Sequence, residues 1–260
     1  YAFPGLTDAS GTAFTISGNS LDLQNVVQFA GGGITVNGAA VDMRRATNLE
    51  QASVTLSGGS INLDAASSIN GASFFVNAGA LSLPSARNYA HTNGNNNNTA
   101  TFRANGSTAE LHLGNLETVT GGDTIDDQFV IEALSGGRIN LGKVTDILDP
   151  TTGDNRGRAI HVKAEGSTSR IDLSSLKTFI DRTSNDWNNE GMSSLTVTLG
   201  GEIHAPLLET LNAVQLNLNG NGTLPIAQIK TLTGGAAVLS GASYAFPGLT
   251  DASGTAFTIS

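Results

Sequence analysis

The chain has 260 residues with 32 glycines, no cysteine and only 5% aromatic residues, and its 13 basic and 22 acidic side chains give a net charge of -9. Without cysteine it has no disulfides or thiolate metal sites, and an acidic chain without a basic stripe is unsuited to bind nucleic acid or an anionic membrane. No apolar run approaches the ~20 residues that a membrane span needs. We therefore expect no nucleic-acid partner, and no membrane span in this segment.

The two ends of the chain carry the same sequence. Tyr1 to Ser17 (YAFPGLTDASGTAFTIS) returns unchanged as Tyr244 to Ser260. An identical stretch of this length does not arise by chance. It predicts one unit over residues 1–243, followed at 244–260 by the start of the next identical unit in a tandem array. The expected partners are further copies of the same repeat, joined end to end in one chain.

A shorter repeat of apolar residues, spaced as Φ-x-Φ-x-x-Φ-x-x-Φ, fills the unit. Its copies start at Tyr1, Leu21, Val41, Ile61, Leu81, Leu111, Ile139, Ile171, Ile203 and Leu224. Most steps between copies are 20 or 21 residues, but four consecutive steps are 28 to 32 residues long. A repeat of this period is typical of stacked architectures.

Each copy predicts the same three elements. An alternating run that ends at glycine, such as 14–18 (FTISG), predicts a strand with one buried face. The following apolar-x-apolar run, as in 21–23 or 171–173, predicts a second strand after a tight corner. The three-residue steps, as from Leu113 to Leu116, predict a looser third side with irregular or 3₁₀-like turns. A helix is disfavoured because these runs are short and rich in Gly, Ser, Thr and Asn.

A unit of about 20 residues with two short strands cannot bury its own apolar face, so neighbouring units must stack. The sequence predicts an all-β fold, a right-handed parallel β-solenoid (β-helix), with about ten coils per unit and longer loops on one corner of four coils. The hand follows the strong preference of parallel crossovers. Leucine-rich repeats are the nearest alternative, but the fixed buried Asn or Cys of such repeats is absent here.

At these residues the chain resembles the parallel β-helical repeats of large bacterial surface proteins, including giant filamentous adhesins. The segments Leu111 to Gly122 (LHLGNLETVTGG) and Ser20 to Gly33 (SLDLQNVVQFAGGG) are also similar to the coils of receptor L domains. The resemblance covers essentially the whole chain. It implies a secreted or surface-exposed structural or adhesive protein, and it assigns no catalytic or binding residue.

The four long steps predict a ridge, because insertions at one corner of a solenoid lie on one side. The insertions are 91–99, 121–128, 148–159 and 180–194. Their polar content includes Asp149 and Asp181, and the candidate lateral-contact or ligand residues are Asp123, Asp126, Asp127, Asp154, Arg156, Arg158, Arg182, Asp186, Trp187 and Glu190. Both charge signs and an aromatic anchor suit contact with a neighbouring rod or a surface glycan. Solvated, insertion-tolerant loops are the alternative.

Calcium is the only metal that the insertions suggest. Clustered carboxylates such as Asp123, Asp126 and Asp127 are ligands that a hard cation prefers. The segment matches neither a complete EF-hand loop nor the glycine-rich nonapeptide of calcium-binding β-rolls. We therefore predict no cofactor, with calcium at these three aspartates as the alternative.

Outward-facing residues of the strands indicate surface ladders and no enzyme. Threonines recur at 15, 35, 55, 196 and 258, and Phe75, Val130, His161 and Val238 interrupt the row, which favours ordinary β-propensity over an ice-binding surface. Asp172 and His204 face outward on successive coils. A polysaccharide-cleaving groove would add Arg or Lys to clustered acids, and no basic residue occupies the equivalent position.

These patterns together predict the structural repeat of a long extracellular fibre, stalk or surface filament. The alternative is a surface adhesin or glycan-binding module that uses the ridge. Both place the protein outside the cell or at its surface, with neighbouring rods or surface glycans as further partners.

Overall fold

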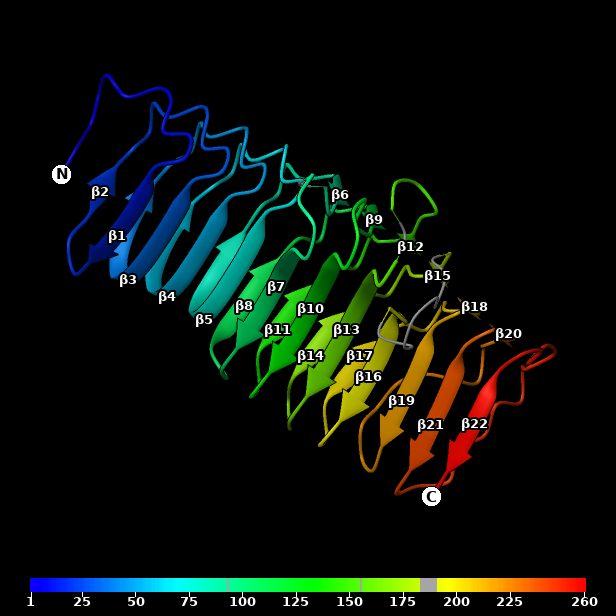
Figure 1. Cartoon of the computed structure of the whole chain (residues 1–260). Helices are drawn as coiled ribbons and strands as arrows, with labels where there is room; N and C mark the ends of the chain where they lie inside the picture. Colours follow the sequence, from blue (N-terminus) through cyan, green and yellow to red (C-terminus); the bar gives the residue numbers. More distant parts are fainter. Residues whose placement is uncertain (93, 155, 183–190) are drawn as a thin grey trace.

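The structure is a computed structural model that describes residues 1–92, 94–154, 156–182 and 191–260. Its described residues form 22 strands and no helix, so none of them provides a helix long and apolar enough to cross a membrane. All paired strands run parallel, and the chain winds from one end of a rod to the other (Figure 1). The predicted parallel β-solenoid is confirmed.

Each coil contributes to three sides of the rod. The first side holds β1 (Ala13–Ser17), the first halves of β3 (Gly33–Asp42), β4 (Ser53–Asn62) and β5 (Ser73–Ser82), then β7 (Thr99–Asn105), β10 (Gln128–Leu134), β13 (Ala159–Glu165), β16 (Ser194–Thr198), β19 (Gln215–Asn219), β21 (Ala236–Ser240) and β22 (Ala256–Ile259). The second side holds β2 (Leu21–Asp22), the second halves of β3 to β5, β8 (Ala109–His112), β11 (Arg138–Asn140), β14 (Arg170–Asp172) and β17 (Glu202–His204). The third side holds β6 (Asn88–Ala90), β9 (Thr118–Thr120), β12 (Asp146–Asp149), β15 (Thr178–Asp181), β18 (Thr210–Asn212) and β20 (Thr231–Thr233).

The strand register follows the sequence repeat. Thr15 pairs with Thr35, and Thr35 pairs with Thr55, so the chain rises by one rung per coil. The corner between the first and second sides lies at the predicted glycines, where Gly18, Gly38 and Gly58 have φ of 72°, 64° and 83°. Glycine adopts this left-handed conformation without the steric cost that a side chain brings.

The apolar positions of the repeat form columns inside the rod. Leu23, Met43 and Leu63 occupy the same place in successive coils and are at most 1% exposed. Where the coils become longer, larger side chains fill the interior: the ring of Tyr89 lies 4.7 Å from that of Phe102 and 4.5 Å from that of Phe129. Stacked aliphatic and aromatic columns thus form one continuous core.

Two sequence predictions are wrong in detail. The third side carries a six-stranded parallel sheet from β6 to β20, whereas the first four coils and the last coil are joined there by isolated bridges. A single turn, closed by Leu116 N donating to Leu113 O at 2.9 Å, spans the three-residue step from Leu113 to Leu116. The next step, from Leu116 to Val119, is extended and leads into β9. On the first side, the row of threonines continues through Phe75, Arg103, Glu132 and Lys163. Val130 and His161 lie in the neighbouring row, because β10 and β13 begin earlier than the shorter strands.

Candidate functional site

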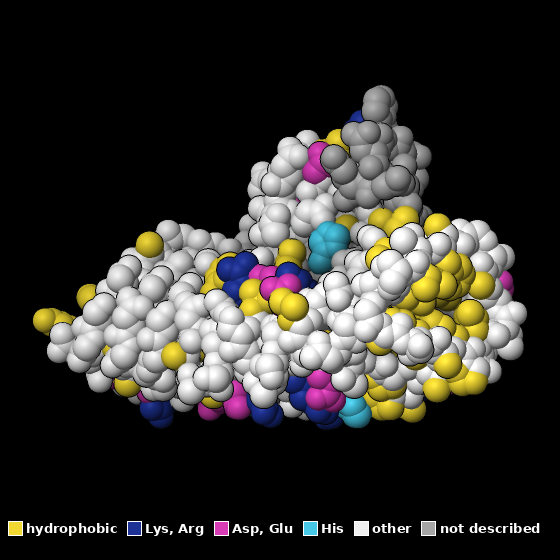
Figure 2. Space-filling view, turned by 90° about the horizontal axis from the view of Figure 1, so that it is seen from below, with side chains coloured by type: hydrophobic (Ala, Val, Ile, Leu, Met, Phe, Trp, Pro, Cys, Tyr) yellow, Lys and Arg dark blue, Asp and Glu magenta, His cyan; other side chains and the backbone are white. Residues whose placement is uncertain are grey.

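The four insertions lie at the same corner of the coils as predicted, and the described residues of the first three stack on one another. Each connects the third side to the first side, and the described residues of the insertions contribute to the ridge that projects from the rod in Figure 2. Backbone hydrogen bonds join them between coils: Asn97 N donates to Ile125 O and Asp126 N donates to Arg156 O, both at 2.9 Å. The ridge therefore continues the stacking of the solenoid beyond its sheets.

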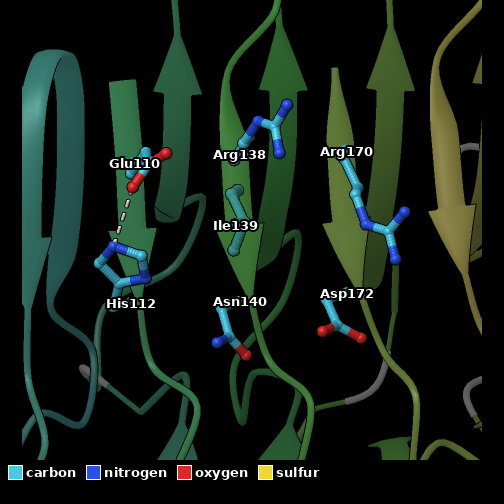
Figure 3. A pocket seen from close by; sticks show the side chains of 7 residues that line it. All are labelled: Glu110, His112, Arg138, Ile139, Asn140, Arg170 and Asp172. Carbon is cyan, nitrogen blue, oxygen red and sulfur yellow. Dashed lines mark hydrogen bonds and ion pairs between the residues drawn. The ribbon is translucent and has the colours of Figure 1, made fainter. Parts of the chain in front are cut away.

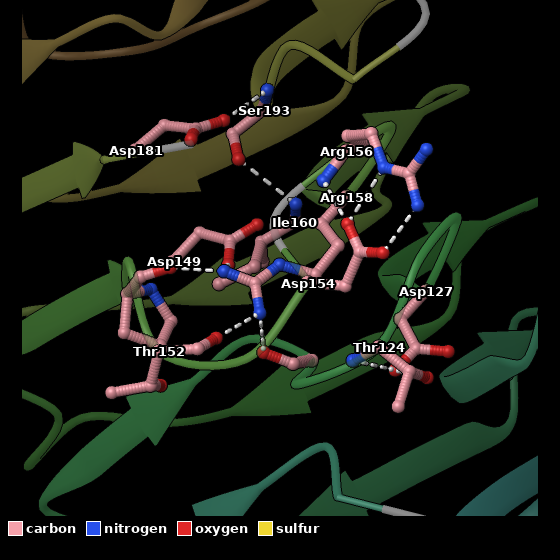
Figure 4. A network of polar contacts seen from close by, with 12 residues as sticks. Thr124, Asp127, Asp149, Thr152, Asp154, Arg156, Arg158, Ile160, Asp181 and Ser193 are labelled. Atoms are coloured by element: carbon pink, nitrogen blue, oxygen red, sulfur yellow. Dashed lines mark hydrogen bonds and ion pairs between the residues drawn. The ribbon is translucent and has the colours of Figure 1, made fainter. Parts of the chain in front are cut away.

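A buried arginine holds the base of the ridge together (Figure 4). The side chain of Arg158 is fully buried, and its Nη1 donates to Gly122 O at 2.7 Å and to Thr152 O at 2.6 Å. Its Nη2 donates to Pro150 O and lies 3.5 Å from Asp149 Oδ1. The planar guanidinium, with five donors, suits several acceptors at once. Arg158 thus ties the second insertion to the third.

Asp149 lies beside this arginine at the end of β12, with no exposed surface. It is in register with Asp181 of β15, and it packs so closely on Gly121 that a Cβ there would lie 2.7 Å from Asp149 Oδ1. Burial, followed by the charge of Asp181, raises the pKa of Asp149 to about 8, against the opposing effect of Arg158. A pKa of about 8 favours the protonated form of Asp149 at neutral pH, and backbone carbonyls accept hydrogen bonds from Arg158.

Other buried polar groups extend the network across the long coils. The carboxylate of Asp127 accepts hydrogen bonds from Thr124 N at 3.1 Å, Thr124 Oγ1 at 2.8 Å and Asn98 N at 3.3 Å. Asp181 Oδ2 accepts from Ser193 N at 2.9 Å. His91 is buried on the first long coil, and burial lowers its pKa against the influence of Asp127. The ridge therefore rests on a polar core that fixes its shape.

The structure places the predicted ridge residues in different environments. Asp126, Arg156 and Arg182 are exposed, and Asp154 is partly exposed and accepts from Arg156 Nε at 2.9 Å. Asp123 is also partly buried. By contrast, Asp127 and Arg158 are buried, so these two residues support the ridge from beneath and do not reach a neighbouring rod. Asp186, Trp187 and Glu190 lie outside the described residues.

The described residues give calcium no site at the three aspartates. Asp126 is exposed, whereas Asp127 is buried and held by its hydrogen bonds to Thr124 and Asn98. Within the described ranges, no three acidic or histidine side chains come together in a group that could hold a metal ion. Calcium at Asp123, Asp126 and Asp127 therefore remains a prediction without geometric support.

Sequence analysis overlooked charged residues on the second side of the rod. Arg138 and Arg170 line a shallow hollow of about 200 Å³ together with Glu110, His112 and Asp172 (Figure 3). His112 Nε2 lies 3.2 Å from Glu110 Oε2, and Arg170 Nη1 donates to Glu202 Oε1 at 2.6 Å. Arg138 and Arg170 lie two residues before Asn140 and Asp172, which occupy the same position in successive coils. The absence of a basic residue at the position of Asp172 therefore does not exclude arginines beside it. Such exposed pairs contribute little to stability.

The duplicated sequence occupies both ends of the stack. At the start of the chain, β1 pairs with β3, with Phe14 in register with Ile34. At the end, β22 repeats the sequence of β1 and pairs with β21, with Phe257 in register with Ala237. The same 17-residue sequence thus packs against the second coil at the start of the stack and against the tenth coil at its end.

No protein-family model, curated protein or solved structure matches this chain in the comparisons that were made. The function must therefore be inferred from the geometry of the fold, and two features stand out in it. One is the supported ridge of loops, and the other is a stack whose last coil repeats its first.

Proposed function

We propose that the chain is a structural repeat of a long extracellular fibre, stalk or surface filament. The observation that carries this proposal is the position of residues 244–260 on the tenth coil. Their third-side bridge joins Asp251 to Thr231, and their first-side strand continues the same parallel sheet. Residues 244–260 therefore continue the first and third sides of the solenoid in register, as a tandem array requires.

The fold suits a load-bearing rod. Parallel strands pair along the rod axis, so each added coil extends the hydrogen-bonded sheets and the apolar columns together. Strands in a sheet are spaced by ~4.8 Å, so the ten steps between β1 and β22 advance the rod by about 48 Å. Stability in such stacks is a sum over coils and their interfaces, and duplication lengthens the rod without a new kind of contact.

The extracellular location is part of the proposal. It rests on the resemblance to large bacterial surface proteins and on the fibre geometry. In this setting, neighbouring rods and surface glycans are the partners that the exposed ridge residues would meet.

Electron microscopy of the native material tests this function. Filaments at the surface of the producing cells, with an axial repeat of about 48 Å and a rung reflection near ~4.8 Å, are the expected result. Discrete globular particles without either spacing would contradict the fibre. Antibodies raised against the purified unit would show that the filaments contain this chain.

A second candidate is an adhesin or glycan-binding module in which the solenoid carries the ridge. The favouring observation is the buried network around Arg158, because solvated loops without a binding role need no such support. The exposed Arg156 and Arg182 and the partly exposed Asp154 would then contact the ligand. Asp42 and Arg44 of a short coil form the same kind of ion pair as Asp154 and Arg156. They are the matched control outside the ridge. Short single stalks at the cell surface, in place of periodic filaments, would favour this candidate.

A further inference from the structure

We propose that Ser194 is an activated nucleophile that cleaves short-chain carboxylic esters, with His161 as its general base. Both side chains lie on the outer face of the first side, where β13 pairs with β16 and His161 is in register with Ser194. The activity goes beyond the proposed fibre, and the fibre does not depend on it. It also differs from the expectation of no enzyme, which rests on residues of the second side.

Ser194, His161 and Gln128 form a hydrogen-bonded chain across three successive coils. Nδ1 of His161 lies 2.9 Å from Ser194 Oγ, and Nε2 of His161 lies 2.8 Å from Gln128 Oε1. A nucleophile within reach of a base, and a base oriented by a third group, is the arrangement that activates a serine hydroxyl. The three side chains thus have the connections of a catalytic triad, with glutamine in place of the usual acid.

The amide of Gln128 sets which nitrogen of His161 carries the proton. Its Nε2 donates to Gly157 O at 2.6 Å, so its Oε1 faces the histidine as an acceptor. His161 Nε2 must therefore donate, which leaves Nδ1 unprotonated and able to accept the hydroxyl proton of Ser194. Burial lowers the pKa of His161 against the opposing charge of Asp181, which favours the neutral imidazole at neutral pH.

Buried contacts hold the backbone next to both members of this pair (Figure 4). Ser193 Oγ accepts from Ile160 N at 2.9 Å, and Ser193 N donates to Asp181 Oδ2 at 2.9 Å. Ile160 and Ser193 immediately precede His161 and Ser194 in the chain. Their fixed backbone keeps the base and the nucleophile at hydrogen-bond distance, as an oriented catalytic pair requires.

Gln215 can stabilise the charge that develops in the reaction. It is in register with Ser194 on the side opposite His161, since β19 follows β16 in the sheet. Among the described residues its side-chain amide has no hydrogen-bond partner, and a glutamine amide is one of the groups that form an oxyanion hole. The carbonyl oxygen of a substrate would accept from Gln215 while the carbonyl carbon meets Ser194 Oγ.

The reaction balances with water as the only co-reactant. Ser194 Oγ attacks the ester carbonyl carbon while Nδ1 of His161 takes the hydroxyl proton. The ester C–O bond breaks, His161 passes that proton to the leaving alkoxide, and an alcohol leaves the acylated Ser194. Water then attacks the acyl carbon, its proton passes through His161 to Ser194 Oγ, and the carboxylic acid is released. Because the site lies on the outer face of a sheet, a short acyl chain, which needs no deep pocket, is the expected substrate.

Labelling with a fluorophosphonate probe, which phosphonylates activated serines, tests the site in the full chain. We expect the unaltered protein to be labelled, with mass spectrometry placing the adduct on Ser194, and to hydrolyse p-nitrophenyl acetate. Ser194→Ala should abolish both, and His161→Gln should slow both at least about 100-fold, the usual minimum for loss of a general base. Ser57→Ala is the matched control, because Ser57 also faces outward on the first side but accepts from Asn77 Nδ2 at 3.0 Å.

The role of Gln128 is to position the base. Gln128→Met should slow labelling, and the nitrogen NMR spectrum of His161 should change from the Nε2–H tautomer to a mixture of tautomers. Far-UV circular dichroism shows whether each variant keeps the fold, and the mapped adduct needs no variant, so the proposal stays testable if one of them unfolds. No adduct on Ser194 in the unaltered protein, or equal labelling of the Ser194→Ala and unaltered chains, would overturn the proposal.

Discussion

Replacing Arg158 by methionine should lower the free energy of unfolding by about 3–5 kcal/mol, the usual effect of removing one partner from a buried charge network. The substitution leaves the carbonyl oxygens of Gly122, Thr152 and Pro150 without their buried donor. Buried acceptors that lose their partners bear the full cost of desolvation. Methionine keeps much of the side-chain volume, so the loss reports the polar contacts more than a cavity.

Arg156→Met is the matched control for this variant. Arg156 lies two residues away on the exposed surface of the ridge, where its side chain is 49% exposed and pairs with Asp154. Exposed ion pairs contribute at most about 1 kcal/mol, so this variant should unfold close to the unaltered protein. Denaturant unfolding gives the stability, and hydrogen exchange at the amide of Asp126 should show whether the ridge loosens. Equal effects of the two substitutions would contradict the anchoring role of Arg158.

Asp149→Asn should change how stability depends on pH. Burial and the charge of Asp181 raise the pKa of Asp149 to about 8 in the folded protein, above the ordinary value of 3.8. Below the ordinary value, both the folded and the unfolded states carry the proton. As the pH rises toward 8, the unfolded state loses this proton while the folded state keeps it, so stability falls by up to about 1.4 kcal/mol per pH unit. Asparagine mimics the protonated group and removes this dependence.

The measurement is the difference in the free energy of unfolding between Asp149→Asn and the unaltered protein at pH 4 to 8. We expect this difference to move steadily in favour of the variant, by a few kcal/mol across the window. Asp154→Asn is the control, because its hydrogen bond with Arg156 lowers the pKa of Asp154 to about 2. Its contribution is fully present above pH 4 and is lost only as the pH falls toward 2. A flat difference for Asp149→Asn would contradict a buried protonated carboxyl.

The apolar columns and the position of the ridge could be predicted from sequence. Leu23, Met43 and Leu63 recur every 20 residues, and a repeat of one coil length leaves few ways to stack. Extra residues between the same two elements of four coils can only leave the rod at one corner. The number of rungs and the corner glycines follow from the same repeat.

The polar core beneath the ridge could not be predicted in this way. Charged residues in insertions are usually solvated, and the burial of Arg158 and Asp149 depends on contacts between insertions of different coils. A pattern within one coil does not encode such contacts. The one local signal is the pair Gly121 and Gly122, because adjacent small residues in an insertion indicate close approach by other groups. Arg138 and Arg170 lie two residues before Asn140 and Asp172, so the residues at the position of Asp172 in successive coils do not reveal them.

The length of a two-unit chain tests the central claim most directly. Such a chain carries residues 1–243 twice before the final 17 residues, and its length and diameter can be compared with those of the single unit by cryo-electron microscopy. If the solenoid continues through the junction, the particle should lengthen by about 48 Å at constant diameter. Two rods that lie side by side, or two bodies joined at a variable angle, would contradict a continuous fibre.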